Sequence, residues 1–151
     1  MATPIIRSIT GTAIARTFAN AVASAAFANA VDAVRVQQSV LSTPGLLLAD
    51  VRLTAVAFGV APVAGSVQLA VIPRDAAGNI GPTPTAAGIL PSKIYTFGPL
   101  IGASNASFGW IMSIDSIPLN ADSDFWLYNN ATGQSIALGC VLTITPWSPG
   151  S

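Results

Sequence analysis

Short apolar runs separated by turn-forming residues make up most of this chain. The runs are rich in β-branched and aromatic side chains, and clusters of Gly, Pro, Asn and Asp lie between them. This pattern of strand-like runs and turn clusters is typical of an all-β domain. Glycine and proline supply the backbone angles that tight turns need. We predict an antiparallel β-sandwich, jelly-roll-like or of a related type, with strands in the runs 31–41, 47–58, 66–72, 93–97, 108–114, 124–128 and 135–147.

Two of these runs alternate clearly enough to predict a buried face. Successive side chains of a strand point to opposite sides, so every second residue shares a face. In the run 47–58 the predicted face consists of Val51, Leu53, Ala55 and Ala57. In the run 135–147 it consists of Ile136, Leu138, Cys140, Leu142 and Ile144, and this strand is long enough to be central in its sheet.

Residues 1–45 differ in composition, since they hold 11 of the 26 alanines. Alanine has the highest helix propensity, so we predict a helix over 13–30 or an extended arm. The pentapeptide Phe18-Ala-Asn-Ala-Val22 recurs as Phe27-Ala-Asn-Ala-Val31, nine residues later. Nine steps reverse the facing direction on a helix and on a strand alike, so only one copy can face the core of its own domain. The expected organisation is an arm or helix over 1–45, a β-sandwich over 46–147 and a tail over 148–151.

The first 31 residues contain no acid, and Ala28-Asn29-Ala30 resembles the small-residue site at which export signals are cleaved. A signal peptide also needs a basic start and an unbroken apolar centre. Here Arg16, Asn20 and Ser24 interrupt the apolar stretch. We therefore expect this segment to remain attached to the domain.

Charge is scarce: six Lys and Arg stand against six Asp, there is no His or Glu, and only 8% of residues are charged. Soluble domains carry about 25% charged residues. Five scattered arginines at zero net charge make no basic stripe, so we expect no nucleic-acid partner. The long charge-free stretches contain Gly, Pro, Asn and Gln, which argues against a membrane-spanning helix. Since exposed apolar surface is rare on monomers, we expect a homo-oligomer that hides much of its outside in subunit contacts.

Few side chains remain for chemistry. The aspartates Asp115, Asp122 and Asp124 are close in sequence and could form the carboxylate pair of a glycosidase or bind Ca²⁺, although capping of turns is the commoner role of Asp. Cys140, the only cysteine, reads as a small buried hydrophobe, because no His is present to activate its thiol. We therefore predict no catalytic residues, no cofactor, no metal and no enzymatic activity.

Aromatic side chains are the remaining candidates for recognition. Phe18 and Phe27 of the repeat, Trp126 and Tyr128 on one side of the run 124–128, and Trp147 near the C-terminus are predicted to lie in a subunit or partner interface. Exposed Trp110, Trp126 or Trp147 could instead stack on sugar rings. This alternative predicts a glycan- or receptor-binding module of a phage tail, a fibre or a secreted adhesin.

The Ala-rich, acid-poor N-terminal segment, the all-β body and the ending Asn-Asn-Ala-Thr-Gly-Gln-Ser-Ile-Ala-Leu-Gly-Cys-Val-Leu-Thr-Ile-Thr-Pro-Trp over 129–147 resemble the small virion proteins of tailed bacteriophages. That family includes capsid decoration or cement proteins, many of them trimers of jelly-roll or related sandwiches. The resemblance implies a non-enzymatic structural protein located in the virion and assembled in the host cytoplasm. It implies further copies, trimers favoured, and the major capsid protein or another virion protein as partners.

Overall fold

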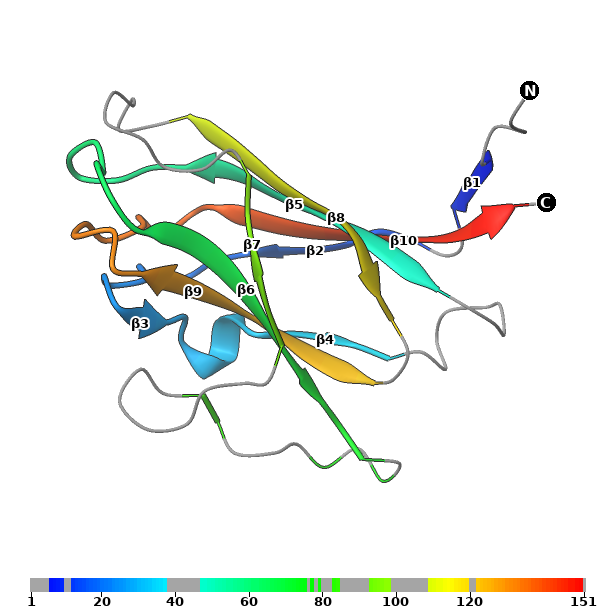
Figure 1. Ribbon diagram of the computed structural model, residues 1–151. Helices are drawn as coiled ribbons and strands as arrows, with labels where there is room; N and C mark the ends of the chain where they lie inside the picture. Colours follow the sequence, from blue (N-terminus) through cyan, green and yellow to red (C-terminus); the bar gives the residue numbers. More distant parts are fainter. Residues whose placement is uncertain are drawn as a thin grey trace.

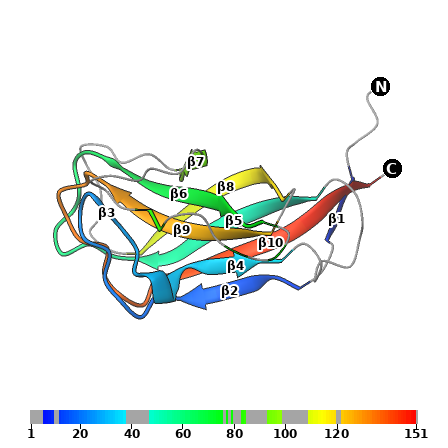
Figure 2. The ribbon, with the colours of Figure 1, turned by 90° about the horizontal axis from the view of Figure 1, so that it is seen from below.

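The fold is an antiparallel β-sandwich of two five-stranded sheets that lie face to face (Figures 1 and 2). It was obtained as a computed structural model, which describes residues 6–9, 12–37, 47–75, 77, 79, 83–84, 93–98, 109–119 and 122–150. The predicted all-β sandwich is therefore confirmed. The first and last strands, β1 and β10, lie side by side, so the chain starts and finishes at the same end of the molecule (Figure 1).

The first sheet has the order β1-β10-β5-β8, and β2 also pairs with β10. Strands β1 and β2 follow one another along the same edge of β10, opposite residues 147–150 and 141–144 respectively. The strands of this sheet are β1 (Ile6–Ile9), β2 (Ile14–Thr17), β5 (Leu48–Val56), β8 (Trp110–Pro118) and β10 (Val141–Gly150).

The second sheet has the order β3-β9-β6-β7, and β4 also pairs with β9. Here β3 and β4 follow one another along the same edge of β9, and the one-turn 3₁₀ helix η1 (Ala30–Asp32) connects them. The strands are β3 (Ala26–Phe27), β4 (Val34–Val36), β6 (Ser66–Pro73), β7 (Lys93–Thr96) and β9 (Ser123–Asn130).

The core lies between the two inner faces and follows the two-residue period of the strands. In the first sheet, Ala49, Val51 and Leu53 of β5 are buried while their alternate neighbours face outward. In the second, the inward positions of β9 and β6 are likewise buried, among them Phe125, Leu127, Val67, Leu69 and Val71. Each sheet thus covers one side of a shared apolar layer.

A β-bulge at Ala55 reverses the alternation of β5. Leu53 pairs with Met112, but Val56 pairs with Trp110, so β5 has one residue more than β8 in this interval. Ala55 takes the extra position with φ of 55°, and its side chain is exposed. The predicted face is therefore right as far as Leu53 and wrong at Ala55, because beyond the bulge the buried side chains are Val56 and Phe58.

The last predicted run is also interrupted. Strand β10 begins at Val141, and a turn at Leu138 and Gly139, with φ of 92° at Gly139, precedes it. Leu138 is consequently 65% exposed, which corrects its predicted place on the buried face, whereas Ile136, Cys140, Leu142 and Ile144 are buried as expected. β10 is the predicted long, central strand, with neighbours on both sides.

Residues 148–150 of the predicted tail belong to this strand, since β10 continues to Gly150 opposite Ile6. Its pairing with β5 ends at Trp147, opposite Leu48. Beyond Trp147, among the described residues, β10 pairs with β1 alone, and a proline, which lacks an N–H group, is tolerated at such an edge position.

The predicted helix over 13–30 is wrong. Residues 14–17 form β2 and residues 26–27 form β3. In the backbone between them, Phe18 N–H donates to the carbonyl of Cys140, next to β10, at 2.9 Å, and Ala25 N–H donates to that of Asn129 in β9 at 2.8 Å. The helix propensity of alanine amounts to only tenths of a kcal/mol per residue, so pairing at two open sheet edges overrides it. Residues 12–37 thus supply edge strands to both sheets and are not a separate arm.

The repeated pentapeptide behaves as its nine-residue offset predicts. Phe18 and Val22 of the first copy are each 1% exposed and belong to the core. In the second copy Val31 is 64% exposed, and Phe27 stacks on Tyr128 with 4.3 Å between ring centroids. Only the first copy therefore places its Phe and Val in the core, whereas the second copy contributes only Ala28 to it.

Buried polar side chains hold the N-terminal segment in place. The Asp32 carboxylate, 2% exposed, accepts hydrogen bonds from the backbone N–H groups of Ala19 and Asn20 and from the Asn20 amide. The fully buried Asn129 amide donates to the carbonyls of Val22 and Gln134 and accepts from the Thr132 hydroxyl. These contacts hold the backbone of Ala19, Asn20 and Val22 against residues that follow later in the sequence.

The two phenylalanines of the repeat allow a matched test of this packing. Phe18→Ala should lower the free energy of unfolding by about 3–5 kcal/mol, because it empties a core position. Phe27→Ala should cost about 1 kcal/mol, mainly the ring stacking on Tyr128. Urea denaturation measures both values, and similar losses for the two variants would contradict the placement of the repeat.

Candidate functional site

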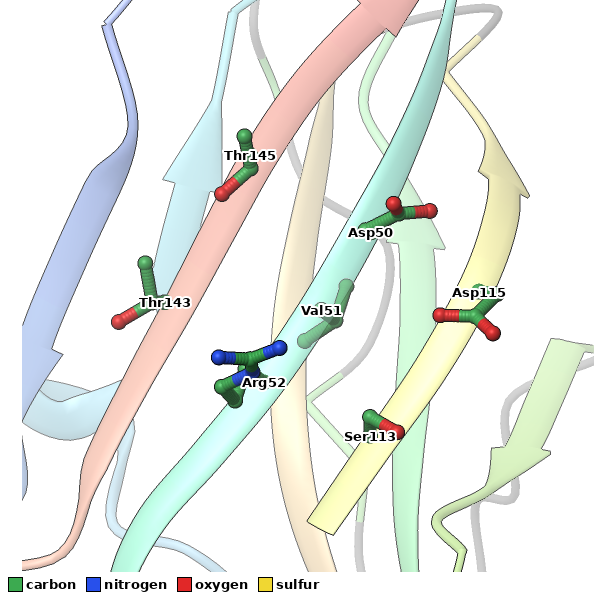
Figure 3. A pocket seen from close by; sticks show the side chains of 7 residues that line it. All are labelled: Asp50, Val51, Arg52, Ser113, Asp115, Thr143 and Thr145. Carbon is green, nitrogen blue, oxygen red and sulfur yellow. The ribbon is translucent and has the colours of Figure 1, made fainter. Parts of the chain in front are cut away.

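The outer side of the first sheet carries a pocket of about 450 Å³, which we call the outer-face pocket (Figure 3). Three neighbouring strands, β10, β5 and β8, form its floor. Its lining residues are Asp50, Val51, Arg52, Ser113, Asp115, Thr143 and Thr145.

Strand register brings these residues together from distant parts of the sequence. Arg52 pairs with Thr143 on one side and with Ser113 on the other, and Asp50 pairs with Thr145. Directly paired residues share a face, so these polar side chains all project outward while the alternate residues fill the core. Val51 contributes no exposed side chain, since it is 1% exposed and belongs to the core.

Asp50 is held by the surrounding strands. Its Oδ1 accepts a hydrogen bond from Trp147 Nε1 at 3.0 Å and another from the backbone N–H of Ser116, also at 3.0 Å. Ser116 lies at a register shift between β5 and β8 and has φ of 61°. The Asp50 carboxylate therefore stabilises an irregular stretch of β8 in addition to lining the pocket.

Arg52 and Asp115 are the exposed charges of the pocket. Figure 3 shows Asp50 extending from β5 toward β8, where Asp115 projects, and Arg52 lying further along β5. Neither Arg52 nor Asp115 forms an ion pair with another residue in the described ranges. The pocket thus presents an exposed cation on β5 and an exposed anion on β8, at separate positions of its lining, and both can still accept a partner.

The aspartate trio of the sequence analysis is divided between the two sheets. Asp115 lies in the outer-face pocket of the first sheet. Asp122 and Asp124 lie at the start of β9 in the second sheet, where Asp122 pairs with Arg35 at 2.6 Å and Asp124 with Arg74 at 2.8 Å. The Arg35 hydrogen bond lowers the pKa of Asp122. The fold therefore does not assemble these three carboxylates into one site, and the described residues contain no cluster of three or more metal-binding side chains.

The other two aspartates act locally. Asp32 anchors the N-terminal segment as described above, and Asp75 accepts hydrogen bonds from the backbone N–H groups of Ala77 and Asn79 in a turn after β6. Five of the six aspartates thus have a hydrogen bond or ion pair that stabilises the fold. In the described part of the chain, Asp115 is the exception.

Cys140 occupies the predicted buried position, with 0% of its surface exposed. Burial raises the pKa of its thiol to about 11. The neutral thiol is therefore the stable form at ordinary pH, which is the opposite of what a nucleophilic cysteine needs.

The predicted interface aromatics are mostly covered within a single chain. Phe18 is in the core, and Trp126 and Trp147 are 4% and 6% exposed. Phe27 and Tyr128 are half-buried and cover one another. An interface role for these five residues stays a prediction.

Sequence reasoning missed the outer-face pocket because its parts come from three separate runs. Polar residues at the alternate positions 50, 52 and 54, and threonines at 143 and 145, mark the outward side of two strands. Which strands are neighbours, however, depends on the sheet order, and alternation within one strand carries no information about it.

Comparison with protein-family models, with curated protein sequences and with solved structures gave no match to this chain. The described residues include no helix with the length and apolar character needed to cross a membrane.

Burial of Cys140 predicts a pH dependence of stability. The unfolded thiol ionises near pH 8.5, whereas the folded thiol stays protonated until about pH 11. Between these values the unfolded state binds fewer protons, so stability falls as the pH rises. Urea denaturation of wild type and Cys140→Ala measures this effect. The stability of the wild type relative to the variant should fall through this window, and parallel pH profiles would contradict the burial.

Proposed function

We propose that this chain is a non-enzymatic structural protein of a virion that associates with copies of itself and decorates the capsid as a cement protein. The proposed partners are further copies of the chain and the major capsid protein. The proposal rests on a surface that has few unpaired charges and several exposed large apolar side chains.

The strand order supports a structural role. When the successive edge strands β1 and β2 count as one, and β3 and β4 as another, the sandwich has eight strands. Their chain order is then 1-8-3-6 in one sheet and 2-7-4-5 in the other, so every connection except β6 to β7 changes sheet. We interpret this order as a jelly roll, an architecture common in viral capsid proteins and also found in lectins.

The fold uses most of its few charges internally. Arg35 and Arg74 pair with Asp122 and Asp124, and Asp32, Asp50 and Asp75 bond to backbone groups. Among the described side chains, this leaves Arg16, Arg52, Lys93 and Asp115 as exposed charges without an ion pair. A surface with so little charge has a small desolvation cost when another protein covers it.

Exposed apolar side chains gather at the end of the sandwich where the β5–β6 loop and the β9–β10 loop lie. Val60 and Val63, in the loop between β5 and β6, are 63% and 67% exposed, and Leu138, in the loop between β9 and β10, is 65% exposed. The two loops are neighbours, because Ala137 N–H donates to the carbonyl of Ala57 at 2.8 Å. They lie at one end of the sandwich, and β1 and the C-terminal end of β10 lie at the other end (Figure 1). Such a group of apolar side chains is suited to contact with another subunit.

In this proposal the protein stabilises a shell by burying surface at many equivalent positions. Each contact can be weak, because a lattice engages many of them together and the effective concentration of the next contact is high. Sugar recognition has less support. Trp126 and Trp147 are buried, and Trp110 is half-buried with its ring edge-on to Phe58, so no indole offers an open stacking surface.

Sedimentation velocity at micromolar concentrations tests self-association. We expect a discrete oligomer and a melting temperature that rises with protein concentration, because association stabilises only the folded state. A monomer at every concentration, with a constant melting temperature, would refute self-assembly. Electron microscopy of native virus particles tests the proposed location separately. Capsid shells that lack this β-sandwich domain would contradict a place in the virion.

A further inference from the structure

We propose that the outer face of the β1/β2-β10-β5-β8 sheet is the surface on which a second copy of this chain docks about a two-fold axis. In this arrangement Arg52 of each copy pairs with Asp115 of the partner subunit. The inference rests on the proposed self-association and names the face that carries it.

Most outward side chains of the face are small, which allows another sheet to approach, and Ile111 of β8, 62% exposed, adds a larger apolar group. Around the outer-face pocket the register places Ala15 beside Thr143, and Thr17 and Thr54 on either side of Val141. Stacked sheets pack about 10 Å apart face to face. Threonine and valine also present methyl groups, so covering them removes apolar area from water.

The charges of Arg52 and Asp115 determine which kind of partner can cover this face. Covering Arg52 or Asp115 without an opposite charge would leave an ion unpaired at low dielectric, which is strongly unfavourable. The adjacent Asp50 is already held by Trp147 Nε1 and the backbone N–H of Ser116. The occupant must therefore supply an anion near Arg52 and a cation near Asp115.

A second copy of the same face meets this requirement. A two-fold contact brings one patch against itself, so residue i meets residue j and j meets i. Because Arg52 and Asp115 line the same pocket, a half-turn about an axis midway between them sets each opposite the other, and two ion pairs form at once. A three-fold ring joins two different patches and would not use both charges of one face in this way. The elementary contact inferred here is therefore a dimer, although the family resemblance favours trimers.

Other occupants fit less well. Small-molecule pockets are lined mainly by apolar and aromatic side chains, whereas the exposed lining here is hydroxyl and charged. A nucleic acid would need several cations, and among the described lining residues Arg52 is the only one. The size suits a protein partner, since four strands about 4.8 Å apart and nine residues long cover about 600 Å², of the same order as the roughly 800 Å² each partner buries in a standard interface.

Charge exchange tests the proposal with the purified whole chain. Arg52→Asp and Asp115→Arg should each weaken dimerisation by at least about tenfold, because each variant places like charges opposite one another. An equimolar mixture of the two should dimerise. In the mixed dimer the introduced aspartate of one variant meets the introduced arginine of the other, while the native Asp115 of the first meets the native Arg52 of the second. The double variant should regain the wild-type dissociation constant. Sedimentation velocity measures all four samples, and thermal unfolding monitors the fold.

Lys93→Asp is the matched control, because it makes the same change in net charge as Arg52→Asp at an exposed position on β7 of the other sheet. It should leave the dissociation constant unchanged. If a reversal variant does not fold, Arg52→Gln and Asp115→Asn replace the pair, and each should weaken dimerisation. Wild-type dimers unaffected by the exchange, or a mixture that stays monomeric, would overturn this interface while leaving self-association intact. A wild type that stays monomeric at every concentration would overturn both.

Discussion

Burial of apolar side chains between the two sheets is the interaction on which the rest of this structure depends. Each strand has one inward side, and the central strands β5, β10, β6 and β9 fill the shared layer with aliphatic and aromatic groups. Once this layer is closed, the outward positions of the same strands are fixed in space. The outer-face pocket therefore results from core packing, since Arg52 projects outward because Val51 and Leu53 on either side are buried.

Most of the charged and buried polar side chains stabilise the fold through hydrogen bonds and ion pairs within the chain. Asp32 and Asn129 satisfy backbone groups of the N-terminal segment in a buried setting, where an unpaired group would cost about 1–3 kcal/mol. Two arginine–aspartate pairs join β4 and the end of β6 to the start of β9. With so few charges in the chain, this use leaves a largely uncharged exterior. The proposed self-association and the proposed docking face both follow from that shortage.

The strand pattern could be predicted where nothing interrupts the two-residue period. The runs 66–72, 93–97 and 124–128 differ from β6, β7 and β9 by two residues or fewer at each end. Errors arose at backbone irregularities, because Ala55 and Gly139 adopt positive φ and shift the phase of the alternation. The aspartate trio failed for another reason. Nearness in sequence did not make the three carboxylates neighbours, since the chain changes sheet between β8 and β9.

By itself the sequence determined that the chain forms strands, that its core is aliphatic and aromatic, that Cys140 is buried and that the Phe and Val of the two repeat copies face different ways. These properties depend on side-chain chemistry and period, which are local. Only the tertiary structure decided that the alanine-rich segment joins both sheets, and that Arg52 and Asp115 share one pocket. The reason is physical: pairing between distant strands outweighs a helix propensity of tenths of a kcal/mol per residue, and sheet order alone decides which outward side chains become neighbours.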